Sequence, residues 1–376
     1  MAAAKKKPEA GKRLDLTFLS FVLILLTTGL VMLFSASYAY SYEYYGNSYK
    51  FITRQAAFAA AGVALMLIIS KIDYHFWRRF AWIVYVLAIG MLAVLLALPP
   101  MVKGMDVKRW IVLGPVNFQP SEVAKFAIIL LFSSLIAGNS KQMKSFKFIF
   151  FLVVLLGLTC GLVVLEPHFS ATILIFTIGI VLLIVGGLPK RYIIGGAALG
   201  VCGGVLAVAT GIIGYGSDRI KYWLDPWADA KGKGFQTIQS LLAIGSGGIL
   251  GRGIGQSRQK YLWLPEPHND FIFAIVCEEL GLIGAVIIII LFCLLVWRGF
   301  TIAMRAQDKF GSLLALGLTF QVGLQAMLNI WVVTNTIPNT GISLPFFSYG
   351  GTSLLILLAE MGIVLSVSRS ANIEKS

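Results

Sequence analysis

The stretch LTFLSFVLILLTTGLVMLF, residues 16–34, decides the fold class of this chain. It carries no charged residue and is about as long as the roughly 20 residues that an α-helix needs to cross the hydrocarbon core of a bilayer. Residues 173–188 have the same character, and similar runs recur along the chain. Because backbone groups in lipid must satisfy their own hydrogen bonds, these runs are expected to be helices. The sequence therefore predicts an all-α, polytopic membrane protein.

The composition agrees with this prediction. The chain is 58% hydrophobic and only 13% charged, with a mean hydropathy of +0.84, whereas a soluble domain carries roughly 25% charged residues. The net charge of +14 is expected to set topology and to meet anionic lipid headgroups, and it does not indicate a nucleic-acid partner. The cysteines lie in apolar stretches without paired spacing, so neither a disulfide framework nor a metal site is expected. These cysteines are Cys160, Cys202, Cys277 and Cys293.

About ten spans are predicted. Their ranges are 16–36, 51–70, 80–98, 121–137, 148–165, 170–187, 192–213, 271–297, 311–333 and 350–368. Most basic residues fall on the side that holds the N-terminus. They include the tail, Lys71, Arg78, Arg79, Lys141, Lys144, Lys147, Lys190, Arg191, Arg298, Arg305, Lys309, Arg369 and Lys375. With an even number of spans, this excess places both termini in the cytoplasm.

This topology divides the chain into three parts. Residues 1–13 are predicted to form a cytoplasmic basic tail, residues 14–370 the transmembrane domain, and residues 371–376 a second cytoplasmic tail. A large extracytoplasmic loop, residues 214–270, joins the seventh and eighth spans. Residues 99–120 and 334–349 lie on the same side, and both are rich in Pro and Gly, which interrupt helices. Irregular backbone near membrane depth is tolerated around a cavity, so we expect the three segments to line one extracytoplasmic cavity.

Asp270 is the first candidate for chemistry. It ends the large loop in the run LPEPHNDFIF, residues 264–273, where the chain re-enters the membrane. A carboxylate at such a place is costly unless it has a use. Three roles fit: an N-cap for the eighth span, a structural partner of Arg219 or Lys125, or a general base. The apolar neighbours are expected to raise its pKa, which suits removal of a proton from a hydroxyl.

Other polar residues near the predicted cavity have two interpretations each. Glu122 and Lys125 lie three positions apart at the start of the fourth span, on one helical face. They form either a structural ion pair or a pair that positions a charged substrate. His268 is either a polar loop residue or a substrate contact. Glu278 and Glu279 lie deeper and are expected to make helix–helix hydrogen bonds.

The Gly-rich run of residues 245–255 is expected to be a flexible re-entrant loop or, less simply, a backbone nest for an anion. Three basic residues that follow its start would suit a diphosphate or a lipid headgroup. These are Arg252, Arg258 and Lys260.

Several motifs together make the chain resemble a known family. They are Arg109-Trp110-Ile111, Gln119-Pro120-Ser121-Glu122 with Lys125, Arg219-Ile220, Asp225-Pro226-Trp227, Gly234-Phe235-Gln236, and the runs 256–260, 264–281 and 341–351. This combination resembles the SEDS family (shape, elongation, division and sporulation) of polytopic peptidoglycan polymerases, typified by FtsW, RodA and SpoVE. The resemblance covers residues 14 to 370, and the run 256–261 looks more like the FtsW/SpoVE branch. The family usually has Thr where this chain has Asn269.

The resemblance implies a glycosyltransferase that polymerises lipid II at the outer face of the bacterial cytoplasmic membrane. The 4-hydroxyl of an incoming lipid II attacks C1 of a strand linked to undecaprenyl diphosphate, and the α-link inverts to a β-1,4 link. Asp270 matches the catalytic aspartate and is expected to be the general base. The other matching or neighbouring residues are expected to bind substrate, with the cations facing the diphosphate. These residues are Arg54, Arg109, Trp110, Glu122, Lys125, Arg219 and His268.

The cofactor prediction is correspondingly open. A divalent cation, Mg or Mn, is compatible with a diphosphate leaving group, but no cage of carboxylates in the sequence demands one. No His or Cys pair has the spacing of a zinc site.

Two other classes of function remain alternatives: a lipid II flippase or transporter, and a non-enzymatic scaffold for division or sporulation. Charged residues within spans fit a transporter as well as an enzyme. The polar residues cluster toward the extracytoplasmic side, however, which favours the polymerase. The resemblance also implies a class B penicillin-binding transpeptidase as partner, together with other divisome or sporulation proteins.

Overall fold

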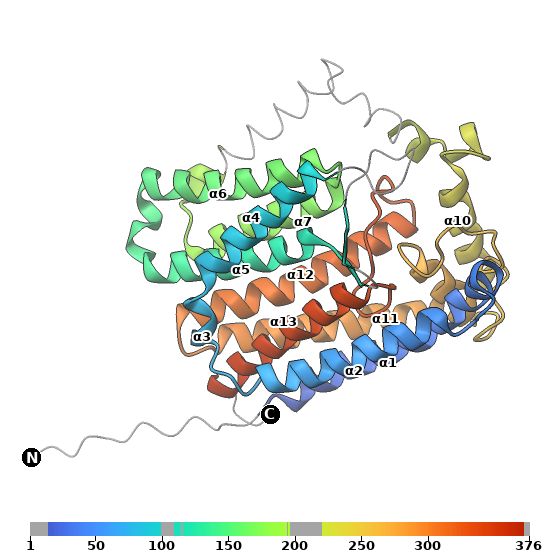
Figure 1. The fold of residues 1–376 in the computed structure, drawn as a ribbon, viewed down its shortest axis with the longest axis horizontal. Helices are drawn as coiled ribbons and strands as arrows, with labels where there is room; N and C mark the ends of the chain where they lie inside the picture. Colours follow the sequence, from blue (N-terminus) through green and yellow to red (C-terminus); the bar gives the residue numbers. More distant parts are fainter. Residues whose placement is uncertain (1–13, 99–108, 114–115, 194, 196–219, 372–376) are drawn as a thin grey trace, which may run out of the picture.

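The computed structural model of this 376-residue chain describes residues 14–98, 109–113, 116–193, 195 and 220–371. Long helices lie side by side along the long axis of the molecule (Figure 1). They are α1 (Leu16–Tyr45), α2 (Lys50–Ile69), α4 (Ala81–Ala97), α5 (Pro120–Gly138), α6 (Phe146–Leu165), α7 (Phe169–Gly186), α11 (Ile272–Met304), α12 (Lys309–Val333) and α13 (Gly351–Ser370). Shorter elements are α3 (His75–Arg78), η1 (Ser140–Lys144), η2 (Pro226–Asp229), α10 (Phe235–Gly247) and an antiparallel hairpin of β1 (Ile111–Leu113) and β2 (Val116–Phe118).

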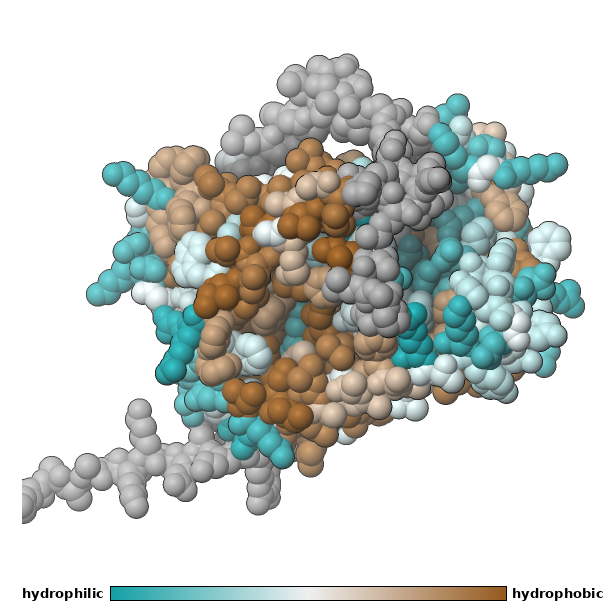
Figure 2. Space-filling model, in the orientation of Figure 1, coloured by the Kyte–Doolittle hydropathy of each residue, from teal (hydrophilic) through white to brown (hydrophobic). Residues whose placement is uncertain are grey.

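The predicted all-α membrane architecture is confirmed. Within the described residues, eight of these helices are long and apolar enough to cross a membrane, and α4 is a shorter apolar helix. Nine of the ten predicted spans thus correspond to helices, and the predicted span 192–213 lies outside the described residues. Figure 2 shows apolar side chains over the middle of one face, with hydrophilic side chains toward both ends of the helices.

Two helices are much longer than the predicted spans. Helix α1 continues to Tyr45 rather than ending at residue 36, and α11 continues to Met304 rather than residue 297. The 33 residues of α11 correspond to a length of about 50 Å, against a hydrocarbon core of about 30 Å. An apolar run predicts the part of a helix that fits lipid, whereas the backbone hydrogen bonds of the helix can continue beyond that run.

Helix α12 lies at the centre of the bundle and packs against α5, α7, α11 and α13. Helices α2 and α13 also pack closely, and small residues permit the approach. A Cβ at Gly62 would lie 2.5 Å from a Leu358 side-chain carbon, and one at Gly362 would lie 2.7 Å from the Met66 carbonyl oxygen. This packing places the C-terminal half of α12 and the N-terminal end of α13 beside residues 266–270 of the large loop.

The large loop is tied to α11 where that helix is interrupted. At Gly281 the backbone leaves the helical region, with φ 67° and ψ −169°. The amides of Arg252 and Gly253 donate to the freed carbonyls of Glu278 and Glu279 at 3.0 and 2.9 Å. In the other direction, the amides of residues 282 and 283 donate to the carbonyls of residues 248 and 249. We call this arrangement of residues 248–260 on residues 278–283 the clasp.

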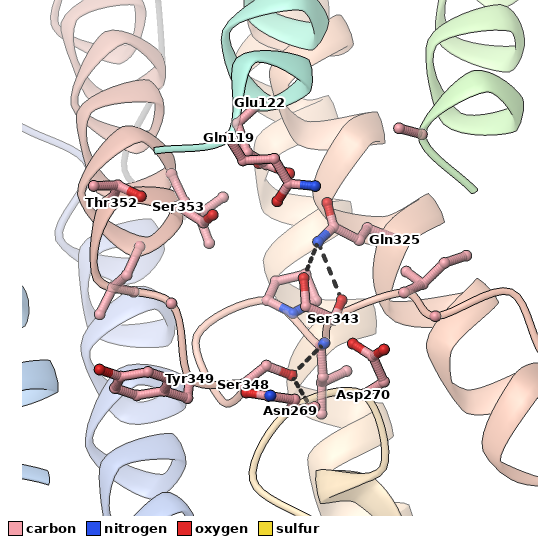
Figure 3. Close-up of a pocket in the computed structure, with 18 of the residues that line it drawn as sticks. Gln119, Glu122, Asn269, Asp270, Gln325, Ser343, Ser348, Tyr349, Thr352 and Ser353 are labelled. Carbon is pink, nitrogen blue, oxygen red and sulfur yellow. Dashed lines mark hydrogen bonds between the residues drawn. The ribbon is translucent and has the colours of Figure 1, made fainter. Parts of the chain in front are cut away.

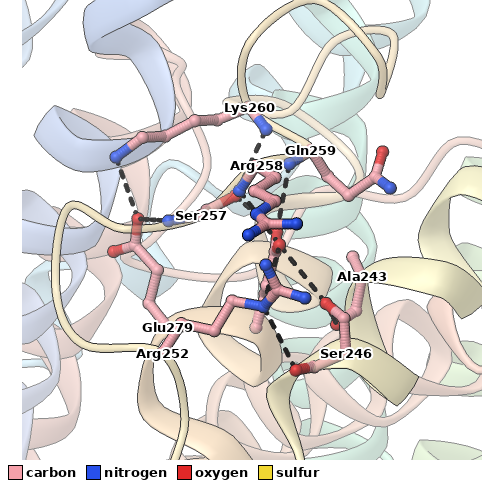
Figure 4. A network of polar contacts seen from close by, with 9 residues as sticks. Ala243, Ser246, Arg252, Ser257, Arg258, Gln259, Lys260 and Glu279 are labelled. Atoms are coloured by element: carbon pink, nitrogen blue, oxygen red, sulfur yellow. Dashed lines mark hydrogen bonds and ion pairs between the residues drawn. The ribbon is translucent and has the colours of Figure 1, made fainter.

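Buried carboxylates complete the clasp (Figure 4). Glu279 accepts hydrogen bonds from Ser35 of α1 at 2.7 Å and from the Lys260 ammonium at 3.0 Å. Glu278 accepts from the amide of Arg258 at 3.0 Å and from the Ser257 hydroxyl. The predicted helix–helix hydrogen bond is therefore confirmed for Glu279.

The expectation of a flexible Gly-rich loop is wrong. Its backbone is bonded into the break in α11 over residues 248–253. Lys260 is buried and its ammonium is paired with Glu279, so this residue is not free to meet a diphosphate or a headgroup. Sequence alone did not reveal this because the partners belong to another helix.

Candidate active site

A cavity of about 620 Å³ opens beside the connecting loops, near the N-terminal ends of α2, α5, α7 and α13 and the C-terminal half of α12. All three segments predicted to line a cavity contribute to it: residues 109–119, the large loop through Gln236 and residues 266–270, and residues 341–350. It also holds six of the predicted site residues. These are Arg54, Arg109, Trp110, Glu122, Lys125 and Asp270.

Asp270 lies in the loop just before α11 and is half-buried at the cavity wall. Phe271 is the N-cap of α11, and this helix start has no side-chain capping hydrogen bond, so the N-cap role considered for Asp270 is wrong. Burial raises the pKa of Asp270 to about 6, with the Glu266 carboxylate adding to the rise and the Arg109 guanidinium opposing it. The carboxyl group can therefore hold a proton near neutral pH and release it again.

Gly341 makes room for the Asp270 carboxyl group. Its φ of +68° lies in the left-handed region, and a Cβ there would lie 3.0 Å from Asp270 Oδ2. Both the backbone conformation and the close approach require glycine. The loop of residues 338–344 therefore shapes the wall against which Asp270 lies.

Glu122 and Lys125 occupy the first two turns of α5 and face the cavity. The Lys125 ammonium contacts Glu122 Oε2 at 2.9 Å and donates to Gln325 Oε1 at 2.9 Å. Gln325 in turn donates from Nε2 to the carbonyl and hydroxyl oxygens of Ser343, each at 3.1 Å (Figure 3). The structural ion pair is thus confirmed, and the pair also lines the cavity, whereas its role in positioning a charged substrate stays a prediction. The ion-pair partner of Lys125 is Glu122 and not Asp270, so Lys125 is not the structural partner that was considered for Asp270.

Arg109 and His168 form a second part of the wall. Arg109 Nη2 donates to the Pro167 carbonyl at 2.6 Å. His168 ends the preceding loop as the N-cap of α7, and its Nδ1 lies 3.4 Å from the Ser121 hydroxyl. Burial, and then the charges of Arg109 and Lys125, lower the pKa of His168 to about 3. The imidazole is therefore neutral, and it supplies a hydrogen-bonding group without adding to the positive charge.

The sequence analysis missed His168, although a signal was present. Residues 166–168 and residues 266–268 are the same triplet, Glu-Pro-His, and each precedes the start of a helix. It also missed two amides, Gln321 and Gln325, because buried amides within apolar helices have no distinctive spacing to a partner in the sequence.

Comparison with known proteins settles the family. The family model FTSW_RODA_SPOVE, described as "Cell cycle protein", matches residues 16–373. The chain belongs to this family. It is 39% identical over 363 residues to "Stage V sporulation protein E" of Bacillus subtilis, covering 94% of this chain and 97% of that protein. It is also 37% identical over 357 residues to "Probable peptidoglycan glycosyltransferase FtsW" of Geobacter sp., covering 94% and 96%.

Solved structures of family members have the same fold. One chain, from "Structural coordination of polymerization and crosslinking by a peptidoglycan synthase complex", is 28% identical with a TM-score of 0.78 and covers 95% of this chain and 98% of its own. RodA of Thermus thermophilus is 26% identical with a TM-score of 0.70, covering 96% and 98%. This FTSW_RODA_SPOVE chain is therefore a multi-pass membrane protein of cell-wall synthesis.

Two of the predicted site residues are not part of the described cavity wall. His268 is buried between aromatic rings, 4.8 Å from Tyr40 and 4.5 Å from Phe51 between ring centroids. Burial lowers its pKa to about 4, so it is neutral, and its contact with substrate stays a prediction. Arg219 lies outside the described residues.

Within the described residues, no group of three or more His, Cys, Asp or Glu side chains could hold a metal ion. The described residues therefore do not fit a protein-held cation cage. A divalent cation, Mg or Mn, therefore stays a prediction.

Proposed function

We propose that this chain is a peptidoglycan glycosyltransferase that polymerises lipid II into β-1,4-linked glycan with inversion at the donor carbon. The observation that carries the proposal is that one cavity is lined by both a candidate base and several cations. Asp270, whose carboxyl group has a raised pKa, lines the same cavity as three cations. These cations are Arg54, Arg109 and Lys125. A cavity of about 620 Å³ is in the range of sites for small ligands.

The reaction follows from this arrangement. Ionised Asp270 removes the proton from the 4-hydroxyl of the acceptor sugar as that oxygen forms a bond to C1 of the donor sugar. The bond between C1 and the diphosphate oxygen breaks, and undecaprenyl diphosphate leaves with the electron pair. Lys125, Arg109 and Arg54 stabilise the charge that develops on the diphosphate. Attack opposite the leaving group turns an α-linked donor into a β-linked product.

The same proposal places the site outside the cell and both termini in the cytoplasm. The basic residues at the opposite helix ends support this orientation. A class B penicillin-binding transpeptidase is the proposed partner, consistent with the match to a chain of a peptidoglycan synthase complex. The proposal includes use of the product in division or in spore cortex synthesis, supported by a relative named for sporulation and by a family described as "Cell cycle protein".

The test is polymerisation of purified lipid II by the chain with its cognate transpeptidase. Asp270→Asn removes the base while keeping size and polarity, and we expect glycan synthesis to fall by about 10²- to 10⁴-fold. Glu43→Gln, which changes an exposed carboxylate at the outer end of α1, is the matched control and should leave synthesis unchanged.

Equal product from the native chain and Asp270→Asn would remove Asp270 from the mechanism. If the native complex made no glycan, the polymerase proposal itself would fail. Transfer of lipid II across vesicles would then distinguish the flippase alternative from a scaffold.

A further inference from the structure

Three amide side chains recur on one face of α12. Gln321, Gln325 and Asn329 are each four positions apart, which places them above one another along the helix. All three are buried in the described structure. An amide within a membrane helix is unfavourable unless its hydrogen-bonding groups find partners. The partners of these amides therefore indicate what each one does.

Asn329, nearest the outer end, joins two loops. Its Nδ2 donates to the main-chain carbonyl of Asp270 at 2.8 Å and to that of Ile342 at 2.6 Å. One side chain thus uses both of its N–H groups to hold the backbone of the Asp270 loop against the loop that precedes α13. Asp270 has no capping bond to α11, so this amide acts together with the Ser348 hydroxyl, which donates to the Asn269 carbonyl, in holding the loop in place.

Gln325, one turn further in, joins a cation to the same loop. Its Oε1 accepts from the Lys125 ammonium, and its Nε2 donates to the carbonyl and hydroxyl oxygens of Ser343. A lysine ammonium is a point charge on a flexible stem, so its place is set by its partners. In the described structure, Glu122 and Gln325 each hold the Lys125 ammonium at 2.9 Å.

Gln321, the innermost of the three, anchors this face of the helix to α13. Its Nε2 donates to Glu360 Oε2 at 2.9 Å, and Glu360 is buried in the bundle. The Glu360 carboxyl group thus links this part of α12 to α13 through the hydrogen bond from Gln321.

We propose that the amide face of α12 is the positioning element of the reaction site. Asn329 sets the loop that carries the base, and Gln325 sets the cation that faces the leaving group, both against the adjacent residues Ile342 and Ser343. This inference rests on the proposed glycosyltransferase activity. Gln325 and Asn329 are positioning residues: they act through Asp270 and Lys125 and do not themselves react.

The proposal has a kinetic signature. A cation that stabilises the departing diphosphate acts in the transition state, so misplacing it lowers kcat and leaves KM nearly unchanged. A displacement of about 1 Å at a reacting centre can cost about 10²-fold in rate. Gln325→Met keeps the length of the side chain and removes all three of its hydrogen bonds. We expect it to lower kcat by about 10- to 100-fold, with KM for lipid II changed by less than about 3-fold.

A double-mutant cycle tests whether Gln325 acts through Lys125. We expect Lys125→Met combined with Gln325→Met to be no slower than Lys125→Met alone, because the ammonium that Gln325 holds is already absent. Gln325→Glu keeps an oxygen for Lys125 and should recover part of the lost kcat. Thr319→Val removes a buried hydroxyl from the same helix, away from the cavity, and should leave both kcat and KM unchanged.

If the losses of kcat in the two single variants multiplied in the double variant, the proposal would be overturned. A Gln325→Met variant that raises KM and keeps kcat would also overturn it. Equal loss of thermal stability and activity in Gln325→Met would reduce the amide to a structural role.

Binding of undecaprenyl diphosphate to the purified chain supplies a second readout that does not need turnover. If the native complex were inactive but bound this lipid, the cycle would be repeated on its affinity. If the effects of the two substitutions on this affinity were coupled, the positioning of Lys125 by Gln325 would be upheld although the polymerase proposal had failed. If the losses of binding free energy were additive, the positioning proposal would be overturned.

Discussion

Asp270 and Glu279 lie on either side of the start of α11, one just before the helix and one within it, in opposite environments. Glu279 is fully buried in the clasp and accepts bonds from Ser35 and Lys260. Asp270 is half-buried at the cavity wall, and its pKa is raised to about 6. In the clasp, the buried charges of Glu278, Glu279 and Lys260 each hold another part of the protein.

The cavity and the clasp therefore differ in what their charges face. Lys260 has a carboxylate and a hydroxyl of the protein around its ammonium, and its side chain is closed off from solvent. Lys125 is held by Glu122 and Gln325 but also lines an open cavity. A buried charge with a complete set of protein partners indicates structure, whereas a held charge that also faces a cavity indicates chemistry. Three variants break or sharpen this contrast.

The largest effect is expected from Glu279→Ala in the clasp. It leaves the Lys260 ammonium buried without its carboxylate, and such changes cost about 3–5 kcal/mol of folding stability. Thermal unfolding of the detergent-solubilised protein measures the loss. Adding Lys260→Met to this variant removes the stranded charge and should restore part of the stability. If Glu279→Ala stayed stable and lost only polymerisation, the clasp would belong to the reaction site.

A smaller loss is expected from Gly281→Ala at the break in α11. Its φ of 67° with ψ −169° is a conformation that is essentially restricted to glycine, and a Cβ would lie 2.2 Å from the Gly251 amide nitrogen. Strain of this kind costs about 1–3 kcal/mol. The same unfolding assay measures it, with Gly157→Ala, where a Cβ meets open space, as the control. Equal stability of the two variants would show that the break tolerates a side chain.

The smallest effect concerns the pH dependence of the cavity. Asp270 must be ionised to act as a base, so the initial rate should be constant above its pKa of about 6 and fall as pH decreases below it. The Glu266 carboxylate raises this pKa, so Glu266→Gln should move the acidic limb to lower pH, by less than about one unit because Glu266 is exposed. A limb that moved to higher pH would contradict this account, and Glu43→Gln should not move it.

Much of the fold and part of the site could be predicted from the sequence. Nine of ten spans correspond to helices because bilayer thickness fixes the length of an apolar run. The meeting of three Pro- and Gly-rich segments at one cavity was also predictable, since all three interrupt spans on one side. The proximity of Glu122 and Lys125 follows from helical spacing and was confirmed at 2.9 Å.

Other features depended on partners that the sequence does not bring together. Gln325 contacts Lys125 across 200 positions of the chain, and Asn329 holds the Asp270 loop across 59. Their four-residue spacing is visible in the sequence, but it does not identify the residues that they contact. The same holds for Lys260, which looked free in the sequence and is paired with Glu279 in the fold.

The sequence by itself determined that this chain crosses a membrane many times, where most spans begin and end, and which loop carries the candidate base. These properties follow from hydropathy and from backbone propensity, which act over a few neighbouring residues. Tertiary structure alone decided which charges are enclosed with partners and which face the cavity. That choice depends on long-range hydrogen bonds and burial, because the environment of a charge is made by residues far from it in the chain.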